Sequence, residues 1–350
     1  KLAKRAVDAV ADLTYFELLT VMAADAFKAA SPDIAIFEAG LGARHDATTA
    51  LPAEMVCFTP IDMDHTNILG ETIYDIAADK ADALRTGVAM AVSAPQSPIP
   101  LAILSNKAED LGIPLCTADQ NNSDDTAGSM LLHVLPKDLA SCMHLPKDQR
   151  LGLKGRHQFM NAQTAVLAWI LLCMRHGWKT NAFCIARGLE DAFIPGRLQY
   201  APAAQGLPQL WLDGAHNAHG MTALCAALKT MDNTMRPGAA VFSCLADKKP
   251  QEMARLLGNA LDDAPIFTPT IADNPRACNC QELAHMLGAH ASPAVSLEDA
   301  LNRAAEAAQG RPVLVCGSLY LLSELYSQHK HLLNPPPRES KQNRRPPSFS

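Results

Sequence analysis

The sequence predicts an α/β protein with two open, mostly parallel-sheet domains. Its 350 residues fit two compact domains at roughly 150 residues each. Short apolar runs alternate with helical patterns along the chain, as they do where helices join parallel strands. The tripeptide I-P-G at 194–196 forms a hinge-like break. We therefore expect one domain over residues 1–194, a second over 195–330, and a disordered tail over 331–350.

The first domain begins with a helical pattern from Leu13 to Ala29, which has apolar residues at 3.6 spacing and ends before Ser31 and Pro32. The run D-I-A-I-F-E at 33–38 predicts a strand that is buried on both faces of a parallel sheet. The elements predicted after it are strands at 55–61 and 88–93, helices at 71–85, 101–111, 158–176 and 182–192, and an irregular exposed loop at 117–150.

The second domain repeats the alternation, which predicts another open sheet. Its predicted strands lie at 209–213, 239–244, 265–268 and 312–316, and its predicted helices at 218–230, 250–261, 280–288, 298–308 and 319–327.

Composition excludes several classes of function. The 30 basic and 36 acidic residues give a net charge of −6 and a pI of about 6.1, so the whole chain is not attracted to nucleic acid or an anionic membrane. The longest apolar run, Ala165 to Met174, is too short to span a bilayer. The ten cysteines contain no C-x-x-C pair, which indicates reduced, buried thiols in a cytoplasmic protein.

The first candidate site follows the strand predicted at 33–38. Glu38 precedes G-L-G-A-R-H-D, which resembles a dinucleotide-binding fingerprint. That fingerprint needs its third glycine for close packing, and His45 stands at this position. A nicotinamide enzyme is therefore set aside.

The second candidate site follows the strand predicted at 55–61, where Asp62, Asp64 and His65 come together. In an open parallel sheet the ligand crevice lies beyond the carboxyl ends of the strands. Carboxylate and imidazole groups there can share a divalent cation, although an ordinary polar crevice has the same composition.

Lys80 is the most unusual residue of the first domain, because it falls within the apolar stripe of the helix predicted at 71–85. A buried ammonium is costly unless it is paired, neutralised or modified. One alternative is that Lys80 extends its stem from the edge of the stripe toward water. The other is modification to a carbamate, which would turn the cation into a carboxylate and a possible metal ligand.

Two strand ends of the second domain carry small or polar residues, D-G-A-H-N at 213–217 and G-S-L-Y-L at 317–321. Such residues suit a phosphate or ribose contact where a strand turns into a helix, although Asp and Asn also cap helices. Together with Arg197 at the hinge, they suggest a nucleotide held between two domains.

These motifs together resemble a known family. The chain is similar to folylpolyglutamate synthase and dihydrofolate synthase, members of the ATP-dependent Mur ligase superfamily. The matching segments occur in family order from about Leu13 to Leu325. They are L-T-Y-F-E (13–17), E-A-G-L-G-A-R-H-D-A-T (38–48), D-H-T (64–66), L-G-E-T (69–72), I-A-A-D-K-A (76–81), G-R-H-Q-F-M-N-A (155–162), P-G-R (195–197), D-G-A-H-N (213–217), A-D-K (246–248) and G-S-L-Y-L (317–321).

The resemblance implies a Mur-ligase-like central ATPase domain and a Rossmann-like C-terminal glutamate-ligase domain. It implies a ligase that joins L-glutamate to folate or dihydropteroate with ATP, through an acyl phosphate. The implied cofactors are ATP and Mg²⁺, with K⁺ as a further cation. A cytoplasmic monomer that acts on small molecules is the implied state.

The resemblance also assigns residues. Lys80, as a carbamate, and His216 are the implied catalytic residues. The implied magnesium ligands are Glu38 and His65, and the implied ATP contacts are Asn161, Arg197 and Asp213. The implied pterin-side pocket consists of Thr14, Tyr15, Phe16, Glu17, Arg44 and Asp46.

One family motif does not occur in these 350 residues. The family begins with a phosphate-binding loop, G-x-x-G-K-[ST], and the chain contains no such run. We therefore expect an N-terminal segment to have been lost, and the chain alone to bind Mg-ATP weakly and to be inactive. The alternative is a catalytically inactive binding protein that keeps the ligase fold. Retention of Lys80 on an apolar helix face favours the ligase.

Overall fold

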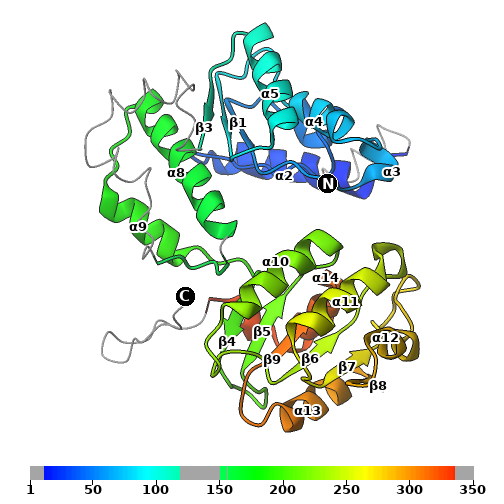
Figure 1. Cartoon of the computed structure of the whole chain (residues 1–350). Coiled ribbons are helices and arrows are strands. Elements are labelled where there is room, and N and C mark those ends of the chain that lie inside the picture. The colour runs from blue at the N-terminus through cyan, green and yellow to red at the C-terminus, as the bar shows by residue number, and fades with distance from the viewer. Residues whose placement is uncertain (1–11, 119–149, 156, 336–350) are drawn as a thin grey trace. The chain divides into compact units, whose positions relative to one another are not determined.

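A computed structural model describes residues 12–118, 150–155 and 157–335 (Figure 1). The chain folds into two compact units. Unit 1 comprises residues 1–147 and 160–185, and unit 2 comprises 148–159 and 186–350. The predicted domain boundary after residue 194 stays a prediction. Most of the loop predicted at 117–150 lies outside the described residues, as do residues 336–350 of the predicted tail. The prediction of a disordered tail is wrong for residues 331–333, which belong to a 3₁₀ helix in which Leu332 is only 4% exposed.

Unit 1 is built on a three-stranded parallel sheet of order β1-β2-β3. The strands are β1 (Met55–Phe58), β2 (Met90–Ser93) and β3 (Leu115–Thr117). Its helical segments are α2 (Tyr15–Ala30), η1 (Ala47–Ala50), α3 (Thr66–Leu69), α4 (Ile73–Ala81), α5 (Pro98–Asp110) and most of α8 (His157–His176), with η denoting a 3₁₀ helix. Helix α9 (Ala182–Asp191) is divided between the two units after Ile185.

Both faces of the unit 1 sheet are covered by helices. On one face, α4 and α5 pack through fully buried side chains such as Ile76 and Leu104. On the other, α8 packs against Val92 through Leu167 and Leu171. Successive strand residues point to opposite faces, so a strand flanked by helices on both sides is apolar throughout. This arrangement confirms the α/β prediction for unit 1.

Helix α2 lies where the sequence predicts it, but its predicted apolar stripe is not buried by the described residues. Phe16 is 39% exposed and Leu19 is 41% exposed, whereas Thr20 is buried. The periodicity predicted the helix correctly, because helical spacing is a local property. It could not predict what covers the helix.

The strand predicted at 33–38 is wrong. The segment has no strand conformation, and Ile36 is 83% exposed. A strand requires a neighbour to satisfy its backbone hydrogen bonds, and no described segment pairs with this one. An apolar run indicates a preference for burial and does not supply the partner.

Unit 2 contains a six-stranded sheet of order β4-β5-β9-β6-β7-β8 (Figure 1). Every pairing is parallel except that of β4 with β5. The strands are β4 (Gln199–Ala201), β5 (Leu210–Asp213), β6 (Ala239–Phe242), β7 (Ile266–Pro269), β8 (Ala291–Ala294) and β9 (Val313–Cys316). The helical segments are α10 (Ala218–Lys229), η2 (Ala246–Lys248), α11 (Pro250–Ala260), α12 (Cys280–Leu287), α13 (Leu297–Ala307), α14 (Leu319–Gln328) and η3 (Lys330–Leu333).

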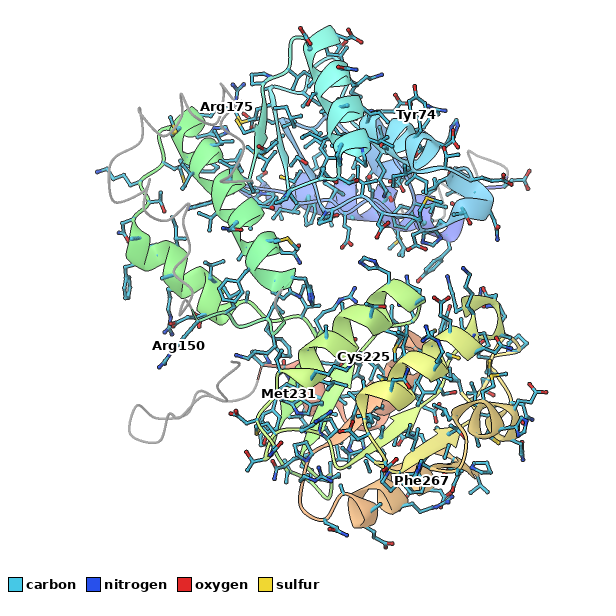
Figure 2. The ribbon with its side chains drawn as sticks, in the orientation of Figure 1. Tyr74, Arg150, Arg175, Cys225, Met231 and Phe267 are labelled. Atoms are coloured by element: carbon cyan, nitrogen blue, oxygen red, sulfur yellow. The ribbon has the colours of Figure 1, made fainter. Side chains whose placement is uncertain are left out.

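Two apolar layers cover the unit 2 sheet. One layer packs α10, α11 and α12 against Trp211 and Phe242, and it includes Cys225 and Met231, which are labelled in Figure 2. The other packs α13, α14 and η3 against Leu212, and it includes Phe267. The two layers confirm the second open-sheet domain.

Three short strands were not predicted, namely β3, β4 and β8. Strands β4 and β8 form the two edges of their sheet. The sequence of β8 is A-S-P-A, which lacks branched apolar residues and contains Pro293. Proline is tolerated in edge strands because one row of hydrogen bonds is absent there. Local sequence therefore does not predict these strands, which form because they pair with the sheet that they join.

The nine described cysteines are free thiols. The predicted burial holds for Cys116, Cys173, Cys225, Cys244, Cys278 and Cys316. It is wrong for Cys57 and Cys184, which are exposed. None of the helices in the described part of the chain is long and apolar enough to cross a membrane.

Candidate functional site

The loop at 40–46 in unit 1 is organised by Asp46. Its Oδ2 accepts hydrogen bonds from the N–H groups of Gly40 (2.8 Å) and Leu41 (3.0 Å). Its Oδ1 accepts from the N–H and the hydroxyl of Thr48, at 2.9 and 2.5 Å. Burial alone would raise the pKa of Asp46, but these hydrogen bonds outweigh it and the pKa is lowered. The predicted pterin-pocket residue Asp46 therefore holds the loop in shape.

We expect Asp46→Ala to lower the free energy of unfolding by about 2 kcal/mol, because the loop loses four hydrogen bonds that share one carboxylate. The lowered pKa adds a pH dependence. The stabilisation is complete above the ordinary pKa of 3.8 and is lost as pH falls through the lowered pKa. Urea unfolding at neutral and acidic pH measures both effects. Asp25→Ala, at an exposed position of α2, is the control and should change little.

Two glycines of this loop allow close packing. A Cβ on Gly40 would lie 2.8 Å from the Phe16 ring of α2. Gly42 has a φ of +63°, and a Cβ there would lie 2.1 Å from Asp79 Oδ1. The N–H of Ala43 donates to the same Asp79 oxygen at 2.8 Å. The loop is thus fixed against both α2 and α4. The motif I-A-A-D-K-A at 76–81 contained Asp79, but its loop contact is visible only in the structure.

Thr14 and Glu17 form a capping box at the start of α2. The Thr14 N–H and hydroxyl donate to Glu17 Oε2 at 2.8 and 2.7 Å, and the Glu17 N–H donates to the Thr14 hydroxyl at 3.2 Å. The Thr14 hydrogen bonds lower the pKa of the Glu17 carboxyl. Both residues were predicted to face a pterin. The spacing T-x-x-E is itself a local signal for the start of a helix.

The other predicted pterin-pocket residues differ in their contacts. Tyr15 is 77% exposed, and Phe16 covers Gly40. Arg44 Nε donates to Asp82 Oδ2 at 2.6 Å, and this contact raises the pKa of Arg44. Phe16 therefore packs on the loop, and Arg44, a residue of the loop, joins it to Asp82. Tyr15 presents a ring to solvent.

Lys80 is partly buried on α4, on the same face as the buried Ile76 and Ala77. Its Nζ makes no hydrogen bond or ion pair with any other described residue. It follows Asp79, which fixes the loop through Ala43. The ammonium is less enclosed than the sequence stripe suggested, and an extended stem that reaches water fits this burial. The carbamate stays a prediction.

The predicted magnesium ligands lie on two separate segments of unit 1. Glu38 is exposed, and its carboxylate makes no hydrogen bond or ion pair within the described part of the chain. His65 has a φ of +52° at the start of α3, and its Nε2 lies 3.8 Å from Asp64 Oδ2. No group of three or more His, Cys, Asp or Glu side chains that could hold a metal occurs among the described residues. Mg²⁺ commonly uses one or two carboxylates and takes its other ligands from phosphates and water, so a free carboxylate fits its donor chemistry.

In unit 2, the turn at 195–198 is joined to the end of β5. The Gly214 N–H donates to Gly196 O at 2.7 Å. The Leu198 N–H donates to Asp213 Oδ2 at 2.8 Å, and the Ala215 N–H donates to Oδ1 at 2.8 Å. Leu198 has a φ of +44°, which is uncommon for a residue with a side chain. The predicted ATP contact Asp213 thus holds a strained turn in place.

The electrostatics of this turn centre on Asp213. Burial raises the pKa of the Asp213 carboxyl, against the opposing effects of its two backbone hydrogen bonds and of Arg197 and His216. Arg197 is exposed and lies near His157, whose pKa is lowered by burial and then by the charge of Arg197. His216 Nδ1 lies 2.9 Å from Gly214 O. The structure therefore brings Arg197, Asp213 and His216 together.

The remaining motif residues have local structural roles. Asn217 caps α10, because its side chain accepts from the Gly220 N–H at 2.8 Å. Ser318 caps α14 by accepting from Tyr320 N–H at 3.1 Å. Gly317 has a φ of +106°, and a Cβ there would lie 2.4 Å from Ser243 O. Asn161 is exposed on α8 and belongs to unit 1, so it is described apart from Arg197.

Comparison with known proteins agrees with this geometry. A family model described as the Mur ligase glutamate ligase domain matches residues 196–319. The dihydrofolate synthase/folylpolyglutamate synthase of Bacillus subtilis is 31% identical over 325 residues, which are 91% of this chain and 72% of that protein. The Escherichia coli protein of the same name is 28% identical over 327 residues, covering 89% of this chain and 69% of that protein.

Solved structures show the same fold. That of Escherichia coli FolC in complex with DHPP and ADP has a TM-score of 0.71 at 25% identity, and covers 93% of this chain and 73% of that chain. The Mycobacterium tuberculosis folylpolyglutamate synthase complexed with ADP and AMPPCP has a TM-score of 0.72 at 24% identity, over 93% of this chain and 75% of that chain. The chain belongs to the folylpolyglutamate synthase and dihydrofolate synthase family of Mur ligases.

Proposed function

We propose that the protein catalyses ATP-dependent ligation of L-glutamate to folate, to dihydropteroate or to both. The substrate carboxylate attacks the γ-phosphorus of ATP, and ADP leaves. The glutamate amine then attacks the acyl carbon of the acyl phosphate, and inorganic phosphate leaves. The observation that carries this proposal is the turn at 195–198, which Asp213 holds so that Arg197 lies beside the D-G-A-H-N loop. This segment lies within the match to the glutamate ligase domain.

The chain's own residues divide between nucleotide and acceptor substrate. Arg197 and Asp213 of unit 2 contact ATP, and the ADP bound in the solved relatives supports a nucleotide site. Asn161 of unit 1 stays a separate prediction of an ATP contact. A guanidinium suits phosphate oxygens because its fork of donors matches their geometry. His216, the predicted catalytic residue, lies near enough to Asp213 for its charge to lower the pKa of that carboxyl. Phe16 packs on the loop at 40–46 and Arg44 belongs to it, and a flat pterin ring and its polar edge would bind there.

Glu38 and His65 would hold Mg²⁺, which supplies positive charge to the phosphates when it is bound. Lys80, as a carbamate, would add a second carboxylate near this position. K⁺ is proposed as a further cation, and a cytoplasmic monomer as the working state. The match of most of the chain to proteins named as synthases supports a ligase over an inactive binding protein. The expected N-terminal phosphate-binding loop stays a prediction.

The test is a coupled assay of ADP release with ATP, Mg²⁺ and L-glutamate, in the presence of dihydropteroate or of monoglutamyl tetrahydrofolate. Because these 350 residues alone are expected to be inactive, the assay uses the chain together with the predicted N-terminal phosphate-binding segment. Mass spectrometry of the acceptor should show addition of one glutamate, and Arg197→Ala should raise the KM for Mg-ATP at least tenfold. ADP release that is independent of glutamate and of both acceptors would contradict the proposal.

A further inference from the structure

A buried hydrogen-bond network lies behind the turn at 195–198. Gln199 begins β4, at one edge of the sheet in Figure 1, and is only 6% exposed. Its side-chain oxygen Oε1 accepts from the Gly196 N–H at 2.9 Å and from the Tyr326 hydroxyl at 2.9 Å. Its Nε2 donates to Leu332 O at 2.8 Å. One buried amide therefore joins the turn to α14 and to η3.

This network completes the attachment of the turn. The N–H of Gly196 is bound by Gln199, and its carbonyl oxygen accepts from the Gly214 N–H. Two residues after Gly196, the N–H of Leu198 donates to Asp213 Oδ2. The backbone is thus fixed on both sides of Arg197. The buried amide oxygen of Gln199 thus accepts from two donors, and its Nε2 donates to one acceptor. Buried polar groups that are hydrogen-bonded in this way make the local structure rigid.

Packing around Gly196 restricts the turn further. Gly196 has a φ of +72°, and a Cβ there would lie 2.6 Å from Leu322 Cδ1 and 3.2 Å from the Tyr326 hydroxyl. Burial, and then the charge of Asp213, raises the pKa of Tyr326, so its hydroxyl remains a donor to Gln199. Helix α14 therefore supports the turn at 195–198 in two ways: it packs against Gly196, and Tyr326 donates a hydrogen bond to Gln199.

The Arg197 N–H donates to Ile194 O at 3.3 Å, but its side chain has no support from the described residues. Its side chain is exposed and makes no ion pair with any described carboxylate. A long exposed side chain loses conformational entropy when it binds a ligand. Because the backbone of the turn is already fixed, the turn itself loses less entropy on binding. The hydrogen bonds of the neighbouring residues therefore set the direction in which the Arg197 side chain projects from the backbone.

We propose that Gln199 is a positioning residue for nucleotide binding, which acts with Tyr326 to fix the backbone of Gly196 and thereby to aim Arg197. This inference rests on the proposed contact between Arg197 and ATP. Gln199 touches no reacting atom. Its loss should weaken Mg-ATP binding and leave the chemical step and the binding of glutamate unchanged.

The test is a double-mutant cycle on the KM for Mg-ATP in the ligation assay. Gln199→Leu keeps the side-chain size and removes all three hydrogen bonds, and we expect it to raise this KM about tenfold, with kcat within about twofold. In an Arg197→Ala background the same substitution should have no further effect. Tyr326→Phe removes a single hydrogen bond, so its effect should be smaller and of the same kind. It also serves if the Gln199→Leu chain fails to fold.

Tyr200→Phe is the matched control. The Tyr200 hydroxyl donates to Gln209 Oε1 at 2.7 Å, so this change also removes one side-chain hydrogen bond from β4, but on the opposite face of the sheet. Its KM should stay at the wild-type value. An unchanged KM in both network variants, or an equal rise with and without Arg197, would overturn the inference. If Arg197→Ala itself left the KM unchanged, the proposed ATP contact would fail first, and the inference with it.

A spectroscopic measurement tests the orientation of the Arg197 side chain independently of enzymatic activity. The charge of Arg197 contributes to the lowered pKa of His157. An NMR titration of His157 should show this pKa rising in Arg197→Ala and, by a smaller amount, in Gln199→Leu and Tyr326→Phe. It should not change in Tyr200→Phe. A His157 pKa that rises in Arg197→Ala alone would mean that Gln199 does not aim Arg197.

Discussion

Replacing Lys80 with Ala should abolish glutamate ligation, with kcat falling on the order of 100-fold or more. Lys80 lies partly buried on α4, its Nζ has no partner among the described residues, and the preceding Asp79 anchors the loop at 40–46. A carbamate at this position would replace an unpaired cation with a carboxylate. Steady-state ligation with saturating ATP and acceptor measures the loss.

The carbamate makes a sharper prediction than loss of activity. The Lys80→Ala chain lacks the long side chain, so formate or acetate can enter the space and restore part of the activity. Carbon-13 bicarbonate should also give a carbamate signal in the wild-type protein that is absent from the variant. Activity that is unchanged in Lys80→Ala would remove Lys80 from the site, and loss without rescue or carbamate signal would leave Lys80 as a plain ammonium.

Lys107→Ala is the control for Lys80→Ala. Lys107 lies on α5 and its Nζ donates to Asp82 Oδ1 at 3.0 Å, in a partly exposed ion pair. Such pairs contribute at most about 1 kcal/mol, so kcat should stay within about twofold. Comparing the two variants distinguishes the general effect of removing a lysine from the specific effect of removing Lys80.

The second large effect is expected at Asp213. Asp213→Ala leaves the N–H groups of Leu198 and Ala215 without their acceptor, and each lost partner costs roughly 1–3 kcal/mol when it is shielded from water. The carboxylate also holds Leu198 at a φ of +44°, which the chain would otherwise avoid. We expect unfolding of unit 2 to become easier by about 3 kcal/mol, and Mg-ATP binding to weaken more than tenfold.

Asp213→Asn tests whether geometry or charge is lost. An amide keeps one oxygen acceptor and replaces the other with a donor, so the variant should retain about half of the stability that Asp213→Ala loses. Thermal unfolding and calorimetry with Mg-ADP measure the two effects. Asp232→Asn, between α10 and β6 and outside the turn, provides the control. Equal stability of the wild type and Asp213→Ala would show that the turn does not depend on this carboxylate.

Part of the site could be predicted from sequence because chemistry-bearing residues follow the carboxyl ends of parallel strands. Asp213 and His216 were named from such a position and Arg197 from the predicted hinge, and the structure brings the three together. For Asp46 and Asp213 the sequence predicted ligand contacts, whereas the structure shows their oxygens bound to backbone N–H groups. Residue type and position do not distinguish a carboxylate that binds a ligand from one that shapes a loop.

Other parts of the site had no sequence signal. Gln199 and Tyr326 are 127 residues apart, yet their side chains share a hydrogen bond. Gln199 has no motif around it, and its importance follows only from the backbone atoms that it reaches. The capping box of Thr14 and Glu17 is different, because T-x-x-E is a local pattern that could have been recognised.

The sequence by itself determined the α/β class, the two units of alternating strands and helices, and most helix positions, such as α8 and α10. These follow from hydrophobic periodicity, helix caps and turn residues, which act over a few neighbouring residues. Only the tertiary structure decided that residues 33–38 form no strand, that the described residues cover the apolar stripe of α2 only in part, and that β4 and β8 form sheet edges. Strand formation and burial both require a partner from elsewhere in the chain, and local sequence does not specify that partner.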